Sequence, residues 1–145
     1  PPPPPPPPKA KAPAGPAIGV RDPNTWSPPC IGPVISPYGP RNGRRHEGMD
    51  VKCPNGGPVT APLAGRVTQA GPGQRGYGNS VTIDHGDGIT SLLPHLSGVD
   101  AAVGQWVTQG QVVGRVGQTG NASTPHLHFE LRDRGRPMDP TPYYQ

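Results

Sequence analysis

Short runs in which apolar and polar residues alternate follow one another from residue 33 to residue 132. Alternate side chains of a strand point to opposite faces of a sheet, so this alternation indicates strands that each bury one face. The runs return about every ten residues, with Gly-containing turns between them and no stretch of helical periodicity. The predicted strands are residues 33–36, 49–52, 59–61, 65–70, 80–84, 89–93, 106–107, 112–116 and 126–132.

This pattern predicts an all-β domain of short, mainly antiparallel strands with long loops around a groove. Asp87-Gly88 stands between two apolar runs, and this dipeptide favours a two-residue hairpin turn. A short helical turn is expected near residues 99–103, and no longer helix is expected.

The composition divides the chain into two parts. It holds 22 Gly and 25 Pro among 145 residues, and ten of the prolines lie in the first sixteen positions. Such a segment has little to bury and favours an extended polyproline conformation. We therefore expect residues 1–28 to be a Pro-rich linker or tail, or a ligand for a proline-recognition module, and residues 29–145 to be the folded domain. The domain is expected to be a monomer, joined by the linker to a longer polypeptide.

Charge and hydropathy narrow the possible partners. The net charge of +4 favours polyanions such as nucleic acid, anionic lipid or cell-wall polymers, although a solvated basic surface is an alternative. The sequence has neither aromatic stacking pairs nor a paired-Cys zinc module, so nucleic acid is excluded as a partner. No apolar run approaches the roughly 18 residues that a membrane span requires, so membrane insertion is excluded as well.

Two cysteines, Cys30 and Cys53, allow one intrachain disulfide. In an exported domain this bond would close a loop of about 24 residues and stabilise the fold by roughly 3 kcal/mol. Two free buried thiols are the alternative.

Two histidines share one face of the last predicted strand. In Pro125-His126-Leu127-His128-Phe129-Glu130, His126 and His128 project together, while Leu127 and Phe129 face the core. Such a pair favours a metal or catalytic site over two surface histidines. Glu130 lies on the same face, where it is either a hydrogen-bond partner of a metal ligand or a plain surface residue.

A second cluster has the spacing of a zinc site. His46 and Asp50 are four residues apart, so their side chains converge, and an imidazole with a carboxylate is ordinary zinc chemistry. Gly48 and Pro54 make a long helix implausible. Glu47 is therefore not expected to be the general base of a His-Glu-x-x-His enzyme.

Together the two clusters predict a catalytic zinc site. Three protein ligands with an open fourth position are typical of catalytic zinc, and His46, Asp50 and one member of the 126/128 pair supply them. The spacing does not decide which member binds the metal. The other member and His95 would remain as free imidazoles able to transfer protons, which is an arrangement for amide hydrolysis.

A series of short motifs runs through residues 33–140. They are Tyr38-Gly39-Pro40-Arg41, His46-Glu47-Gly48-Met49-Asp50, Pro58-Val59-Thr60-Ala61, Gly76-Tyr77-Gly78-Asn79-Ser80-Val81, Asp84-His85-Gly86, His95-Leu96-Ser97, Gly117-Gln118-Thr119-Gly120 and His126-Leu127-His128-Phe129-Glu130. In these motifs and their order the sequence resembles the lysostaphin-type (LytM-like) zinc endopeptidases of peptidoglycan. The resemblance implies the LytM-like barrel-sandwich hybrid fold, one zinc ion held by His46, Asp50 and His128, and catalytic roles for His95 and His126.

One position departs from the family pattern. Leu93 stands where an aromatic residue is usual, and because it lies on the same strand face as His95 we expect it to make the cleft more apolar. Tyr38, Arg41 and Asn79 are expected to line the substrate groove.

Three further residues are expected to be structural. His85 is predicted to be a strand-end or turn residue rather than a metal ligand, and Trp26 and Trp106 are predicted to be packing residues rather than sugar-stacking platforms.

The predicted function is that of a secreted or phage-delivered zinc endopeptidase that cuts stem peptides or cross-bridges of bacterial peptidoglycan in the cell wall. Two alternatives stay open: a non-catalytic domain of the same fold that activates wall amidases, and a module that binds peptidoglycan without cutting it.

Overall fold

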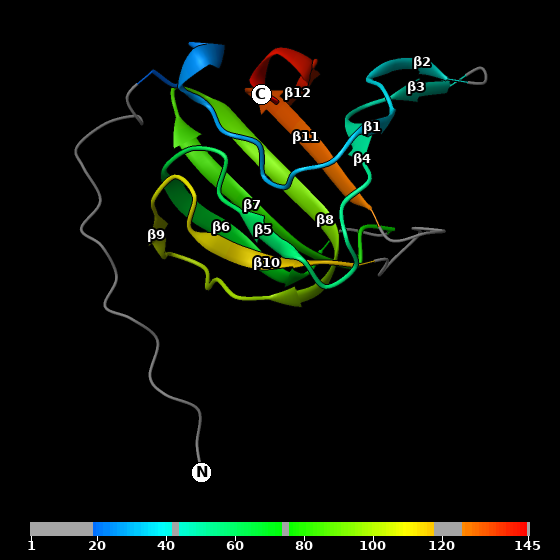
Figure 1. Ribbon diagram of the computed structural model, residues 1–145. Coiled ribbons are helices and arrows are strands. Elements are labelled where there is room, and N and C mark those ends of the chain that lie inside the picture. The colour runs from blue at the N-terminus through cyan, green and yellow to red at the C-terminus, as the bar shows by residue number, and fades with distance from the viewer. Residues whose placement is uncertain (1–18, 42–43, 74–75, 118–125, 145) are drawn as a thin grey trace.

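The computed structural model describes residues 19–41, 44–73, 76–117 and 126–144 (Figure 1). The tail of residues 1–18 and most of the predicted Gly117-Gln118-Thr119-Gly120 turn lie outside these ranges.

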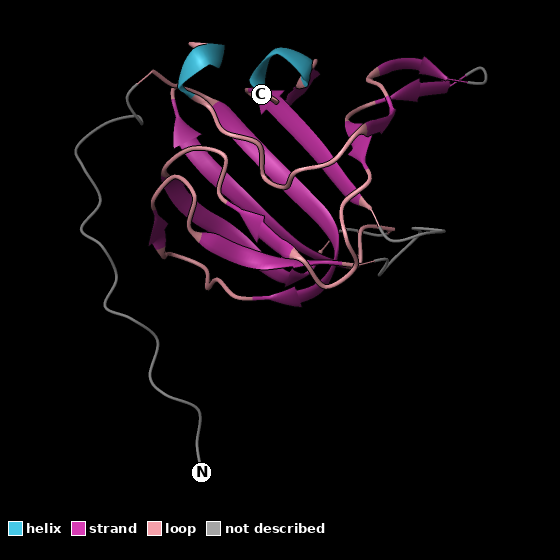
Figure 2. Ribbon diagram, viewed as in Figure 1, coloured by secondary structure: helices cyan, strands magenta, loops and turns pink. Residues whose placement is uncertain are grey.

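The described residues form twelve strands and two short 3-10 helices, and every strand pair is antiparallel (Figure 2). In chain order they are η1 (Pro23–Thr25), β1 (Val34–Ser36), β2 (Gly39–Arg41), β3 (Arg44–His46), β4 (Met49–Val51), β5 (Pro58–Thr60), β6 (Gly65–Pro72), β7 (Asn79–Gly86), β8 (Ile89–Val99), β9 (Trp106–Val107), β10 (Val112–Val116), β11 (Leu127–Asp133), β12 (Arg136–Met138) and η2 (Thr141–Tyr143).

Ten of the strands belong to one sheet, with the order β1-β4-β11-β8-β7-β6-β9 along its main path. β10 pairs with both β5 and β8, and β12 pairs with β11, while β2 and β3 form a separate hairpin that projects from the sheet (Figure 1). The core side chains come from alternate positions of these strands, and Met49, Ile83, Leu127 and Phe129 are fully buried there. The predicted all-β, antiparallel fold is confirmed.

Each predicted strand has a counterpart, but three strands were not predicted. β2, β3 and β12 contain Arg, Gly and Pro rather than an apolar alternation. The expected helical turn near residues 99–103 is wrong. β8 continues to Val99, and the Gln105 N–H donates to the Ala102 carbonyl in a tight turn. At the predicted hairpin, Asp87 and Gly88 both have positive φ (52° and 80°), as a type I′ turn requires.

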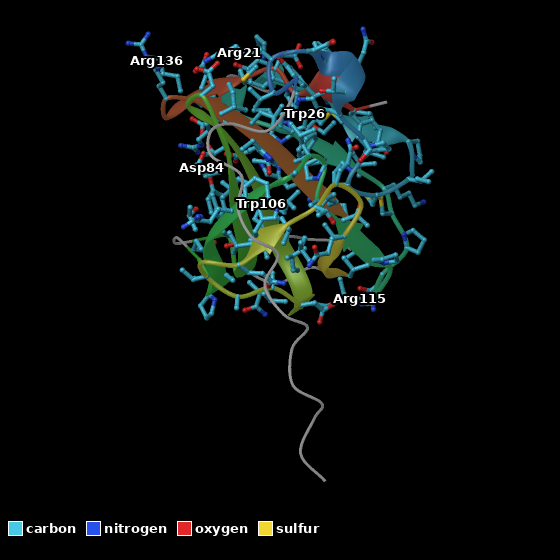
Figure 3. The ribbon with its side chains drawn as sticks, turned by 90° about the vertical axis from the view of Figure 1, so that its left-hand side faces the viewer. Arg21, Trp26, Asp84, Trp106, Arg115 and Arg136 are labelled. Atoms are coloured by element: carbon cyan, nitrogen blue, oxygen red, sulfur yellow. A yellow bond between two sulfur atoms is a disulfide. The ribbon has the colours of Figure 1, made fainter. Side chains whose placement is uncertain are left out.

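The segment before β1 packs against the sheet domain. Trp26 is 5% exposed, and its Nε1 donates to the Val20 carbonyl over 3.0 Å. Arg21 makes an ion pair with Asp133 at 3.1 Å, and Figure 3 shows its position at one end of the molecule. Residues 19–28, which composition assigns to the linker, thus lie on the domain because they bury apolar side chains there.

A disulfide fastens this segment to the sheet. It joins Cys30, just before β1, to Cys53, just after β4. This is the pairing that the sequence predicts, and it holds the two flanks of the His46–Asp50 region together.

His85 is a buried residue inside β7 rather than part of a metal site. Its Nδ1 is 2.9 Å from the Ala64 carbonyl oxygen, and its Nε2 is 2.8 Å from the Ser91 hydroxyl. The Trp26 ring packs against it in an edge-type contact with a centroid distance of 4.8 Å. Burial lowers the pKa of His85 to about 4, more than the Ala64 carbonyl raises it. The ring is therefore neutral, donates to Ala64 and accepts from Ser91.

This lowered pKa predicts acid sensitivity of the fold. The unfolded chain binds a proton at His85 near pH 6.5, whereas the folded chain does not until about pH 4. The free energy of unfolding should therefore fall as the pH drops from 6.5 to 4, by up to about 3 kcal/mol. Urea unfolding at about pH 7 and about pH 5 measures this loss. His85→Asn should lose less stability between the two conditions, and an equal loss would contradict the assignment.

Candidate metal centre

Two neighbouring strands bring the central pair of the site together. β11 pairs with β4 so that His128 lies directly opposite Asp50. β4 also pairs with β1, where Ser36 is the partner of Asp50. Because paired positions in a sheet share a face, this register places the imidazole and the carboxylate side by side. His128 Nδ1 is 2.7 Å from Asp50 Oδ1.

His46 enters the site from the end of β3. Its Nδ1 lies 2.9 Å from the Pro37 carbonyl oxygen, which leaves Nε2 to point toward Asp50 Oδ1 at 3.5 Å. Gly48 allows the chain between His46 and Asp50 to lie close against β11. A Cβ at position 48 would lie 2.6 Å from the Phe129 carbonyl oxygen and 2.8 Å from His128 Nε2.

Ligand atoms of His46, Asp50 and His128 all lie within 4.8 Å of one another. The three residues are 8–9% exposed. The ring nitrogen of each histidine that faces away from the cluster is anchored, in His46 by Pro37 and in His128 by Glu130. Two imidazoles and one carboxylate with fixed outer contacts fit a zinc ion, and these are the three ligands that the resemblance implies.

Burial and two neighbouring carboxylates determine the pKa of His128. Burial lowers its pKa, but the hydrogen bonds with Asp50 and Glu130 outweigh burial and raise the pKa to about 9. Burial likewise raises the pKa of Asp50, but the hydrogen bond and charge of His128 outweigh it and leave this pKa below its usual value. Asp50 and Glu130 thus place two carboxylates in contact with His128, and this negative charge favours a bound cation at the cluster.

His95 and His126 lie next to this cluster. Their ring centroids are 5.8 Å apart, and that of His95 is 6.0 Å from that of His128. His126 Nε2 is 3.5 Å from Asp50 Oδ1, but among the described residues His126 is not in the group whose ligand atoms converge within 4.8 Å.

A bulge in β8 points His95 into the site. Asn79 pairs with Leu96 and Val81 with Leu93, so Pro94 and His95 together face the single residue between them on β7. His95 has φ of 63°, an uncommon conformation for a residue with a side chain, and its N–H donates to the Tyr77 carbonyl.

The same bulge overturns the expectation for Leu93. Regular alternation would place Leu93 beside His95, but Leu93 is 0% exposed and belongs to the core. The extra residue breaks the period of two between positions 93 and 95, so Leu93 does not line the cleft.

Glu130 connects the metal cluster to a second polar group. Its Oε1 is 2.8 Å from His128 Nε2 and accepts from the Tyr77 hydroxyl over 3.2 Å. Its Oε2 accepts from Arg132 Nη2 and Nε at 3.0 and 3.2 Å. Glu130 is 2% exposed, and burial raises its pKa, but the contacts with His128 and Arg132 lower it more.

Sequence reasoning missed Tyr77 and Arg132 as members of this network. Arg132 could have been found, because it continues the period of two from His126 through Glu130 on one face of β11. Tyr77 is 53 residues from Glu130 in the chain, and only the pairing of strands brings the two together.

The three predicted groove residues differ in position. Tyr38 follows Pro37, whose carbonyl anchors His46, and Asn79 is the register partner of Leu96, next to His95. The backbone of Arg41 is at the far end of the β2–β3 hairpin, where it pairs with Arg44. The structure therefore brings Tyr38 and Asn79 near the cluster and does not bring the Arg41 backbone there.

Comparison with known proteins decides the family. Residues 44–140 match Peptidase family M23, and this range contains the three residues of the cluster and the two histidines beside it. The chain belongs to Peptidase family M23.

Relatives within the family carry different names. The M23 chain is 42% identical over 113 residues to the DD-carboxypeptidase/endopeptidase Mpg of Neisseria meningitidis serogroup B, covering 74% of this chain and 26% of that protein. It is 37% identical over 120 residues to the murein hydrolase activator NlpD of Escherichia coli, covering 83% and 31%. The chain therefore spans less than a third of either relative.

A solved structure confirms the fold. The catalytic domain of the antimicrobial peptidase lysostaphin from Staphylococcus simulans aligns with a TM-score of 0.70 and 31% identity, covering 86% of this chain and 96% of that domain. Among the described residues, no helix is long and apolar enough to cross a membrane.

Proposed function

We propose that this M23 domain is a zinc-dependent endopeptidase that hydrolyses peptide bonds in the stem peptides or cross-bridges of bacterial peptidoglycan, acting in the cell wall. One observation carries the proposal: His46, Asp50 and His128 converge on a point beside which two further imidazoles lie. A relative named as an endopeptidase and a solved domain named as a peptidase support it.

In this proposal the three residues of the cluster and the two histidines beside it have separate roles. His46, Asp50 and His128 would hold one zinc ion, which when bound supplies the Lewis acid that polarises the scissile carbonyl and activates water. His95 and His126 would move protons and stabilise the developing oxyanion, His126 through Nε2, which faces Asp50. The ring centroids of the two histidines are 5.8 Å apart, so one substrate amide can reach both.

Glu130 is proposed to position His128. It accepts a hydrogen bond from His128 Nε2–H, which fixes the ring so that Nδ1 faces the metal position beside Asp50 and can bind the ion once its proton has left. Tyr77 and Arg132 hold Glu130 in turn. Tyr38 and Asn79 are proposed to border the peptide groove.

A second function has support from one relative. NlpD, 37% identical, is named as a murein hydrolase activator. A domain with that role would act on another hydrolase and would need no cleavage of its own. The complete ligand set of this chain favours the endopeptidase.

Incubation of the zinc-loaded protein with purified sacculi tests the proposal. Mass spectrometry should detect released peptide fragments with new amino termini, and a chelator should stop their release. Zinc content per chain is measured on the same sample. If sacculi stay intact with zinc bound, and a separate amidase becomes active only when this protein is added, the activator function is correct instead.

A further inference from the structure

A small pocket lies on the sheet next to the metal centre. Its volume is about 220 Å³, and four adjacent strands contribute to its lining. Leu92 is the register partner of both Glu130 on β11 and Thr82 on β7, so the pocket occupies the face that carries Glu130. Because the lining residue Leu92 lies opposite Glu130, which follows His128 by two residues, the pocket begins at a level about 6.6 Å along the strand from the metal ligand.

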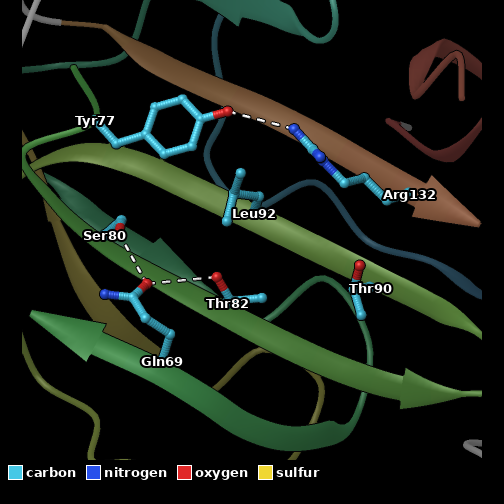
Figure 4. A pocket seen from close by; sticks show the side chains of 7 residues that line it. All are labelled: Gln69, Tyr77, Ser80, Thr82, Thr90, Leu92 and Arg132. Carbon is cyan, nitrogen blue, oxygen red and sulfur yellow. Dashed lines mark hydrogen bonds between the residues drawn. The ribbon is translucent and has the colours of Figure 1, made fainter. Parts of the chain in front are cut away.

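On one side of the pocket, three polar side chains form hydrogen bonds with one another. Gln69 Oε1 accepts from the Ser80 hydroxyl at 2.8 Å and from the Thr82 hydroxyl at 3.4 Å (Figure 4). The Gln69 amide group donates to the carbonyls of Gly71 and Pro72. The polar groups on this side of the pocket therefore already have hydrogen-bond partners within the protein.

The opposite side is formed by Arg132 and Tyr77, across Leu92 from these polar groups (Figure 4). Arg132 uses Nε and Nη2 to bind Glu130, and Nη2 is also 3.4 Å from the Tyr77 hydroxyl. Among the described residues, Nη1 has no hydrogen-bond partner. The Arg132 side chain is 29% exposed, so the guanidinium is fixed on one edge and accessible on the other.

An exposed carboxylate already lies at this guanidinium. Glu47 Oε2 is 3.5 Å from Arg132 Nη2, and the Glu47 side chain is 51% exposed. This contact is long and solvent-screened, so a carboxylate brought by a ligand can replace it. The free edge of an anchored guanidinium matches a carboxylate in two parallel hydrogen bonds.

The rest of the lining limits the size and polarity of the ligand. Leu92 and the methyl groups of Thr82 and Thr90 offer apolar surface for methylene groups. A pocket of this size is smaller than the roughly 300–1,000 Å³ of a complete small-molecule site, so it suits one side chain of a larger substrate.

We propose that this pocket is a substrate subsite that binds a free carboxylate on a short aliphatic stem, carried by a residue one or two positions from the scissile bond. Arg132 is its specificity-determining residue, and Glu47 is a competitor for the same guanidinium edge. The inference rests on the proposed peptidase function, since it assigns the peptide that the metal centre would cut.

Matched ligands test the subsite by binding, without turnover. The zinc-loaded His95→Ala chain is titrated calorimetrically with cross-linked muropeptide dimers in two forms, one with free side carboxylates and one with carboxamides in their place. The carboxamide form should bind about tenfold more weakly, as expected for loss of one charge-assisted contact at a partly exposed site. Adding Arg132→Lys should remove most of this difference at equal zinc occupancy.

Two further variants separate this role from support of the metal site. Glu47→Gln leaves the Arg132–Glu130 contact in place and should strengthen binding of the carboxylate form two- to fivefold, as expected for removal of a weak exposed competitor. Arg134→Lys, the same substitution at an exposed arginine outside the pocket lining, should preserve the preference for carboxylate. Equal binding of the two dimers, or an unchanged preference in the Arg132→Lys chain, would overturn the subsite.

The wild-type zinc-loaded chain distinguishes failure of the subsite from failure of the proposed function. If the carboxylate preference is present in binding and neither dimer is cleaved, the subsite stands and the endopeptidase proposal fails. If both dimers bind equally and both are cleaved, the endopeptidase stands and the subsite fails.

Discussion

The His128→Ala protein is expected to bind zinc more than about a hundredfold more weakly than the wild type and to release no peptide from sacculi. The change removes the nitrogen that lies 2.7 Å from Asp50 Oδ1 and leaves Asp50 and Glu130 without their shared partner. Loss of an outer hydrogen-bond partner alone typically costs 10–100-fold in metal affinity, and loss of the ligand itself should exceed this. Zinc content by elemental analysis and zinc titration by calorimetry measure the effect.

His126→Ala is the matched control for this prediction. His126 lies two residues before His128, just ahead of β11, and outside the converging group, so its loss should leave zinc content unchanged. Circular dichroism of both variants shows whether the sheet is intact. Zinc retained by His128→Ala and lost by His126→Ala would exchange the two assignments.

The alternation of apolar and polar residues predicted the sheet because each strand buries one face in a shared core. It could not predict β2, β3 or β12, because the sequences Gly39-Pro40-Arg41, Arg44-Arg45-His46 and Arg136-Pro137-Met138 show no alternation of apolar and polar residues. It also placed residues 19–28 in the linker, since the burial of Val20 and Trp26 depends on a surface made by distant strands.

The sequence was enough to predict which residues form the site, but it was not enough to predict how they are arranged. Strand periodicity places His126 and His128 on one face, but only the register that sets His128 opposite Asp50 distinguishes them. The bulge at Pro94 and His95 changes the face of every residue after it, and its local sign is Pro94, which a central strand accommodates at a bulge. For this reason the expectation for Leu93 failed while that for His95 as a neighbour of the cluster agreed with the structure.

The His95→Ala protein is expected to keep its zinc and to lose turnover by about 10²–10⁴-fold, the usual contribution of a positioned general acid or base. His95 is outside the group of converging ligand atoms, and its ring lies 5.8 Å from that of His126. Zinc content and the initial rate of peptide release from sacculi are measured on the same preparation. A normal rate with zinc bound would remove His95 from the mechanism.

Backbone relaxation could imitate this result, because His95 holds a φ of 63° that alanine tolerates poorly. His95→Asn separates the two causes, since asparagine adopts this conformation more readily and retains the bulge without an imidazole. If the imidazole is what matters, His95→Asn and His95→Ala lose turnover equally while both bind zinc. If the bulge alone matters, His95→Asn recovers most of the rate. In that case His95 acts by shaping the strand next to the metal centre rather than by transferring a proton.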